Sequence, residues 1–169
     1  MIYHDINIEQ TISRKSHKVN DLYTLLCGIL IAFMFFLEVA TLNLAYSVFI
    51  IIAIVSIYFL QHTKKVEFDY TYTNGVLDVD RITGGAKRKN LLSVNMEQLV
   101  VVAPAKTEPV QPYVGRRMKT FDCTSHTEAP YYTMIVKDDQ SGEEIKVLLE
   151  LNEELLTELK RKQGTKVHI

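Results

Sequence analysis

A long apolar stretch near the N-terminus limits what this chain can fold into. The residues from Leu22 to Leu60 include a single charged side chain, Glu38. As one helix this stretch would reach about 60 Å at ~1.5 Å per residue, twice the ~30 Å hydrocarbon core of a bilayer. Two helices that fold back on each other fit that thickness. The pattern therefore predicts a transmembrane hairpin, with spans at residues 22–40 and 44–60 joined by a turn at 41–43.

The basic residues around the hairpin predict its orientation. Arg14, Lys15 and Lys18 precede the first span, and Lys64 and Lys65 follow the second, whereas the turn contains neither Lys nor Arg. Loops rich in Lys and Arg stay in the cytoplasm. We therefore expect a multi-pass protein of the cell membrane with both termini in the cytoplasm.

The chain divides into three predicted segments: an N-terminal cytoplasmic segment at 1–21, the hairpin at 22–63 and a soluble β-rich domain at 64–169. For the first segment we expect either a short amphipathic helix from about Asn7 or a frayed tail. The domain carries 16 basic and 16 acidic residues from Lys64 onward. Because it is neutral, it lacks the basic field that nucleic-acid binding requires, and no nucleic acid is expected as a partner.

The domain begins with a clear β-hairpin pattern. Residues 66–73 alternate between apolar and polar side chains, as a half-buried strand does. Asn74-Gly75 follows, the pair that favours a type I′ turn because both positions need positive φ. With these two residues as the loop, Tyr72 pairs with Leu77 and Tyr70 with Val79.

The rest of the domain continues this pattern. A second hairpin at Gly84-Gly85 would place Asp80 opposite Lys89. A proline-containing loop is expected at 104–115, and the last helix has Asn152 as its N-cap. Leu155, Leu156 and Leu159 are expected to be buried, and Gly164 ends the helix. The remaining strands are predicted at 89–94, 99–103, 119–125, 131–138 and 144–151.

This element order predicts the fold class. About seven mainly antiparallel strands followed by one amphipathic helix resemble a pleckstrin-homology-like barrel, an α+β domain in which the C-terminal helix plugs an open corner. With the helices before it, the expected architecture is an α-helical transmembrane hairpin plus this domain. An antiparallel sandwich with one helix is the alternative.

The whole chain also resembles a family of uncharacterised two-span membrane proteins from anaerobic Gram-positive bacteria. The resemblance rests on the hairpin, on the run from Tyr70 to Asp80, and on the basic stretch Lys87-Arg88-Lys89 that leads into Leu91-Leu92-Ser93-Val94. It implies the architecture, a pleckstrin-homology-like cytoplasmic domain and a bacterial origin. It implies no activity.

Two basic clusters are the candidate contact sites. Each lies in a domain tethered close to the bilayer, where anionic headgroups attract Lys and Arg by ~1 kcal/mol per charge. The clusters are expected to contact anionic lipid or a protein partner. They consist of Lys87, Arg88 and Lys89, and of Arg116, Arg117 and Lys119.

Two further motifs are weaker candidates for a functional site. Cys123 and His126 form a Cys-x-x-His pair, but no second pair completes a four-ligand zinc site. As a nucleophile pair they would need a third, orienting group. The acidic residues Glu67, Asp69, Asp78 and Asp80 share one strand face and are expected to be solvated rather than to bind a cation. We expect no catalytic residue, no metal and no cofactor.

The sequence thus predicts a non-catalytic, membrane-anchored binding or scaffold module whose partners are the lipid bilayer and an unidentified membrane or cytoplasmic protein. One alternative is an enzyme or enzyme subunit that uses the Cys123/His126 region. Another is an accessory subunit of a larger membrane transporter.

Overall fold

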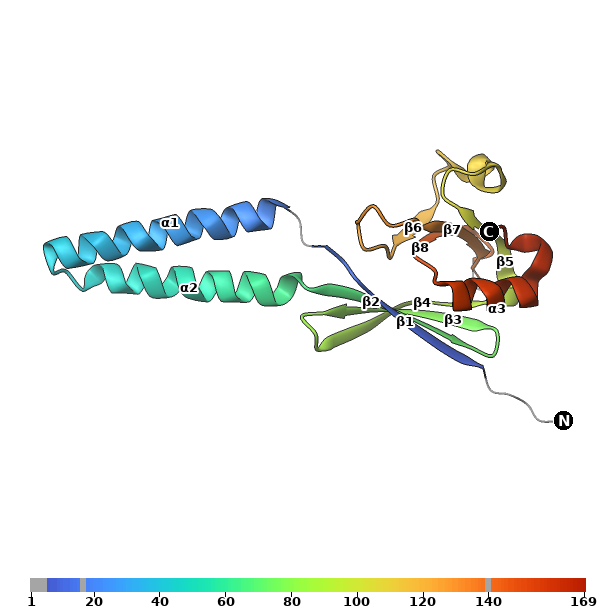
Figure 1. Ribbon diagram of the computed structural model, residues 1–169, viewed down its shortest axis with the longest axis horizontal. Coiled ribbons are helices and arrows are strands. Elements are labelled where there is room, and N and C mark those ends of the chain that lie inside the picture. The colour runs from blue at the N-terminus through green and yellow to red at the C-terminus, as the bar shows by residue number, and fades with distance from the viewer. Residues whose placement is uncertain (1–5, 16–17, 139–140) are drawn as a thin grey trace.

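The computed structural model describes residues 6–15, 18–138 and 141–169. Two long helices project from a domain built on two four-stranded sheets (Figure 1). In spatial order, the first sheet contains β1 (Asn7–Ser13), β2 (Val66–Thr73), β3 (Val76–Thr83) and β4 (Lys87–Asn95). The second contains β5 (Leu99–Pro104), β7 (Tyr132–Lys137), β8 (Glu144–Leu149) and β6 (Lys119–Asp122).

The two helices, α1 (Lys18–Thr41) and α2 (Ala45–Lys64), lie side by side as the apolar pattern predicts (Figure 1). Near the turn, the Ser47 hydroxyl donates a hydrogen bond to Glu38. Within the described residues, Asp21–Thr41 is long and apolar enough to cross a membrane, and the apolar part of α2, Ala45–Phe59, is shorter. The helical pair is therefore confirmed, while the second crossing stays a prediction.

The expectation for the N-terminal segment is wrong where the structure describes it. Residues Asn7–Ser13 form strand β1, which pairs antiparallel with β2, with Ile8 opposite Tyr72 and Ile12 opposite Phe68. Ile6, Ile8 and Ile12 share one parity, the signal of a strand with one apolar face. Residues 1–5 and 16–17 of this segment lie outside the described residues. The helical pair is thus inserted between two neighbouring strands of one sheet.

The first predicted hairpin is confirmed. Asn74 and Gly75 have φ of 50° and 98°, and Tyr72 faces Leu77 while Tyr70 faces Val79. The second hairpin differs from the prediction by one residue. Its loop holds three residues, Gly84 to Ala86, so Thr83 pairs with Lys87 and Asp80 lies opposite Asn90 instead of Lys89.

The second sheet departs from the predicted pattern at β6. The strand predicted at 119–125 ends at Asp122, and it pairs with β8 in parallel although the other pairs in this sheet are antiparallel. The loop before it contains a short 3-10 helix, η2 (Glu108–Tyr113). A second 3-10 turn, η1 (Met96–Gln98), links the sheets between β4 and β5. The predicted barrel is not closed, because no pairing joins β4 to the second sheet among the described residues.

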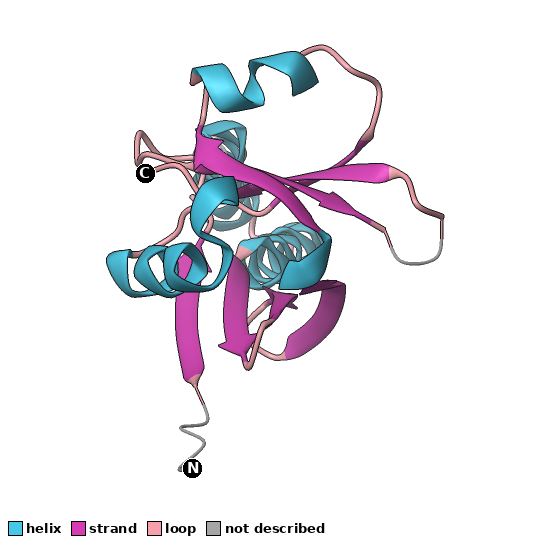
Figure 2. Cartoon of the chain, turned by 90° about the vertical axis from the view of Figure 1, so that its right-hand side faces the viewer, coloured by secondary structure: helices cyan, strands magenta, loops and turns pink. Residues whose placement is uncertain are grey.

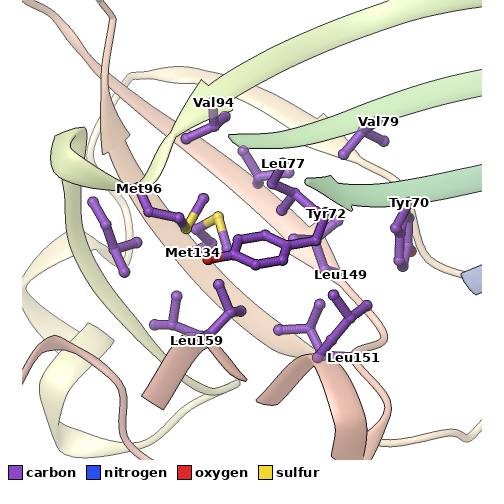
Figure 3. Packing of buried hydrophobic residues seen from close by; sticks show 14 of the residues in the cluster. Tyr70, Tyr72, Leu77, Val79, Val94, Met96, Met134, Leu149, Leu151 and Leu159 are labelled. Carbon is purple, nitrogen blue, oxygen red and sulfur yellow. The ribbon is translucent and has the colours of Figure 1, made fainter. Parts of the chain in front are cut away.

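Helix α3 (Glu153–Gln163) begins and ends as predicted. The Asn152 side chain accepts a hydrogen bond from the Leu155 N–H at 2.8 Å, and Gly164 follows the last turn, at the start of the 3-10 turn η3 (Gly164–Lys166). The helix lies along one side between the two sheets (Figure 2). Leu155, Leu156 and Leu159 are buried against the core, where Leu159 lies near the ring of Tyr72 and Met134 (Figure 3).

Candidate functional site

The end of the first sheet that joins the helices gathers four chain segments, which we call the helix-proximal edge: residues 14–15, Lys65, the β3–β4 loop at 84–86, and residues 122–125. The Gly84 N–H donates to the Lys65 carbonyl at 2.8 Å. The N–H groups of Arg14 and Lys15 donate to Val66 and Ser125 carbonyls, also at 2.8 Å. One residue separates α2 from β2, so α2 and this edge are joined without a flexible linker.

Lysines dominate the exposed charge near this edge. Lys15, Lys65 and Lys87 are exposed, and each lies in one of its segments or directly beside one. Arg14 is engaged inside the domain, because its guanidinium donates to the Thr124 and Asp122 carbonyls at 3.0 and 2.6 Å and covers the Phe68 ring. Within the described residues these three lysines form no ion pair, so they are the groups available to contact a ligand here.

The structure divides the predicted cluster of Lys87, Arg88 and Lys89. Alternation along β4 turns Arg88 to the outer face of the sheet, where it forms ion pairs with Asp69 and Asp80. Lys87 and Lys89 lie on the opposite face, and Lys89 is paired across the strands with Arg81. Arg88 thus relieves the repulsion between Asp69 and Asp80, which lie opposite each other on β2 and β3.

The second predicted cluster lies in the other sheet and the loop before it. Arg116 forms an ion pair with Glu144 at 3.3 Å and covers the Tyr113 ring. The Lys119 ammonium lies 4.9 Å from the centre of the Phe121 ring. Arg117 is exposed. In each cluster, therefore, one of the three basic residues is paired with a carboxylate: Arg88 in the first and Arg116 in the second.

Cys123 is a core residue rather than an accessible thiol. Its side chain is fully buried, and burial, with a contribution from the charge of Asp122, raises the pKa of the thiol to about 12. Its carbonyl accepts a hydrogen bond from the Tyr70 hydroxyl at 2.7 Å. A reactive cysteine needs an ionised, reachable thiolate, and this environment provides neither.

His126 is oriented toward Asp122. Its Nε2 lies 2.8 Å from an Asp122 carboxylate oxygen, and its own φ is 57°. Burial alone would raise the pKa of Asp122, but hydrogen bonds from His126 and Thr124 and the nearby Arg14 outweigh it, so that pKa lies below its ordinary value. Cys123 and His126 therefore do not act as a pair. His126 instead belongs to a hydrogen-bond network with Asp122 and Thr124, and Arg14 connects this network to the end of β1.

Three of the four acidic residues on the outward face of the first hairpin accept hydrogen bonds from neighbouring strands. Thr11 donates to Asp69 at 2.5 Å, Ser13 to Glu67 at 3.2 Å and Asn90 to Asp80 at 2.9 Å. Across the described part of the chain, no group of three or more His, Cys, Asp or Glu side chains is arranged to hold a metal ion.

A cavity of about 360 Å³ lies where the barrel is open. Its lining comes from both sheets and includes the β4 run Leu91–Val94 and, across the gap, Lys119 and Phe121 of β6 and Ile145 of β8. We call this cavity the seam groove. Sequence reasoning missed it because it depends on which strand edges face each other, and no local pattern encodes that.

The comparison with protein families agrees with the fold. A family model described as a bacterial PH-like domain (DUF6106) matches residues 4–169. No curated protein and no solved structure matches the chain. The match covers the predicted PH-like arrangement of mainly antiparallel sheets and a C-terminal helix, and it includes β1 and both long helices.

Proposed function

This chain belongs to the family of bacterial PH-like domains whose model spans residues 4–169, and we propose that it is a non-enzymatic binding module held at the cell membrane by α1 and α2. The exposure of these helices carries the proposal. Among the described residues, every strongly exposed large apolar side chain except Val114 and Ile169 lies on α1, α2 or their turn. Water-exposed apolar surface costs about 25 cal/mol per Å², so a bilayer is the solvent that suits it.

The pairing of β1 with β2 supports two crossings. These strands lie side by side in one sheet, one directly before α1 and the other directly after α2. If the helices enter a bilayer, the start of α1 and the end of α2 would therefore lie on the same side of it, which supports an even number of crossings. The whole of α2, with 20 residues, is about 30 Å long. Its apolar part, Ala45–Phe59, is shorter, and local thinning of the bilayer would accommodate it.

The basic residues at the helix-proximal edge support a cytoplasmic domain. Arg14, Lys15 and Lys65 flank the helices on the domain side, and the turn at the far end has neither Lys nor Arg. Reporter fusions test this orientation. A fusion at Ile169 should be active only as a cytoplasmic reporter, and one in the 42–44 turn only as an external reporter. The reverse result would contradict the proposed topology.

Contact with anionic headgroups is the proposed role of the helix-proximal edge. Lys15, Lys65 and Lys87 are exposed close to where the helices leave the domain. Each Lys near an anionic surface contributes about 1 kcal/mol, enough to set the tilt of a domain that the helices already anchor. In this proposal Arg88 takes no part, because its charge is paired with Asp69 and Asp80.

A fluorophore in the β3–β4 loop tests the contact. The full chain with Cys27→Ser and Ala86→Cys is labelled and placed in nanodiscs of phosphatidylcholine, with or without phosphatidylserine, that carry a headgroup quencher. Quenching should be stronger with phosphatidylserine, and should weaken as salt rises, because exposed charges are screened.

Charge reversal provides the matched control. The double variant Lys65→Glu/Lys87→Glu should lose the extra quenching. Lys160→Glu/Lys162→Glu, which makes the same change in net charge on exposed positions of α3, should retain it. Equal quenching in both lipid mixtures would remove headgroup contact from the proposal.

The proposal also holds that the domain performs no Cys123/His126 chemistry. The buried, protonated thiol of Cys123 supports this. In the Cys27→Ser background, Cys123 should react with iodoacetamide only after denaturant unfolds the domain. Rapid alkylation of the folded protein would instead favour the enzyme alternative.

A further inference from the structure

The seam groove is bordered by two strands that each end a sheet. β4 is the last strand of the first sheet and β6 the last strand of the second. Their outward edges carry backbone donors and acceptors without a strand partner in the described part of the chain. Such edges readily accept a further strand from another chain.

The chemistry of the lining favours a particular kind of strand. Leu92, Phe121 and Ile145 provide apolar surface, which suits every second side chain of an extended segment. Lys119 and Lys137 line the same cavity, and neither forms an ion pair with a described carboxylate. Asp138, the acidic residue of the lining, accepts a hydrogen bond from Ser141 at 2.9 Å. The groove therefore suits a segment that alternates apolar and acidic residues.

The position of β4 suggests where this segment comes from. β4 begins directly after the β3–β4 loop of the helix-proximal edge and runs away from it. A chain that leaves the bilayer beside α2 would meet the start of β4 first and could follow its edge. This step rests on the proposed attachment of α1 and α2 to the membrane.

We propose that the seam groove docks an extended, acidic and apolar juxtamembrane segment of another membrane protein, which adds a strand to the free edge of β4. Main-chain hydrogen bonds to β4 would provide affinity, and the apolar lining and the two lysines would provide selectivity. The added strand would lie in the opening between β4 and β6.

Two synthetic peptides test the groove on the full chain in detergent micelles. One alternates valine with glutamate, the other valine with lysine, and both carry a fluorophore for anisotropy. The glutamate peptide should bind saturably, and the lysine peptide should bind at least about tenfold more weakly. Because the assay uses no bilayer, it can fail while the headgroup experiment succeeds, and the reverse also holds.

Variants locate the binding. Lys119→Glu should weaken binding of the glutamate peptide about tenfold, because it replaces an attraction between opposite charges with a repulsion. Lys119→Gln, which only removes the attraction, should weaken binding less. Lys162→Glu, on the exposed side of α3, should leave affinity unchanged. Equal binding of both peptides, or equal affinity in Lys119→Glu and the original chain, would overturn the proposal.

Hydrogen exchange identifies the strand edge. The glutamate peptide should slow exchange of amides in β4, and leave those of β1 unchanged. Slowed exchange at β1, or no saturable binding, would overturn the proposal. Protection of β4 that grows with protein concentration in the absence of peptide would also overturn it, because a second copy of this chain would then be the occupant.

Discussion

Two buried tyrosines on β2, Tyr70 and Tyr72, differ in the hydrogen bonding of their hydroxyl groups. The Tyr70 hydroxyl donates to the Cys123 carbonyl at 2.7 Å and accepts from the Glu150 N–H at 3.5 Å, whereas the Tyr72 hydroxyl has no partner in the part of the chain that the structure describes. Both rings are fully buried. A satisfied buried hydroxyl contributes about 1 kcal/mol, and an unsatisfied one costs free energy.

The matched substitutions to phenylalanine should therefore change stability by different amounts. Tyr70→Phe should lower the free energy of unfolding by about 1–2 kcal/mol, because the Cys123 carbonyl and the Glu150 N–H each lose a partner. Tyr72→Phe should be neutral or slightly stabilising. Thermal unfolding of the full chain in detergent measures both. A loss for Tyr72→Phe as large as that for Tyr70→Phe would show that both hydroxyls are satisfied.

Asp122 links stability to pH. Its pKa is lowered in the folded state, since the stabilising His126 and Thr124 hydrogen bonds outweigh burial. A pKa that is lower in the folded state stabilises the fold at pH values above the unfolded pKa of ~3.9. This stabilisation is lost as the pH falls through the folded pKa. Asp122→Asn should therefore lower the melting temperature at neutral pH, and the difference from the original chain should shrink in acid. A difference that is independent of pH would contradict this linkage.

At the scale of single elements, the β2–β3 turn depends on positive φ at Gly75. An added Cβ at Gly75 would meet nothing within 4 Å, so a larger residue is resisted by backbone conformation alone. Gly75→Val should cost about 1–3 kcal/mol. Gly28→Val is the control, because Gly28 is helical and equally open. Equal melting temperatures for the two variants would contradict the assigned turn.

Helix α3 stabilises the domain through its buried leucines. Leu159 is fully buried between the sheets, and its removal leaves a cavity that the surrounding strands cannot fill. Leu159→Ala should cost about 2–5 kcal/mol. Lys160→Ala, exposed on the same helix, should change stability by less than about 0.5 kcal/mol. Similar small effects of both variants would mean that α3 does not plug the core.

At the scale of the whole molecule, the helices and the sheet form a continuous unit. A Gly-Ser insertion between Lys64 and Lys65 should reduce headgroup quenching at the β3–β4 loop, because the domain could then rotate relative to the bilayer. The same insertion after Ile169 should have no effect. The melting temperature of the domain reports whether the insertion disturbs the fold itself. Unchanged quenching in an intact fold would show that the linkage does not set orientation.

Local patterns were sufficient for elements whose partners are close in sequence. The turn at Asn74-Gly75, the pairing of Tyr72 with Leu77 and the capped helix after Asn152 all followed from chemistry within about ten residues. The two apolar helices followed from length and composition in the same way. For these elements, the residues that decide the conformation are neighbours along the chain.

Tertiary structure alone decided what depends on distant partners. β1 pairs with β2 although two helices separate these strands in the sequence. The Gln10 side chain forms hydrogen bonds with the backbone of Glu150 and Asn152, which are also remote in sequence. The parallel pairing of β6 with β8, the use of Arg88 between Asp69 and Asp80, and the seam groove depend equally on packing. A strand edge or a charge acquires its role only when the fold supplies its neighbour, and no periodicity in the sequence encodes which neighbour that is.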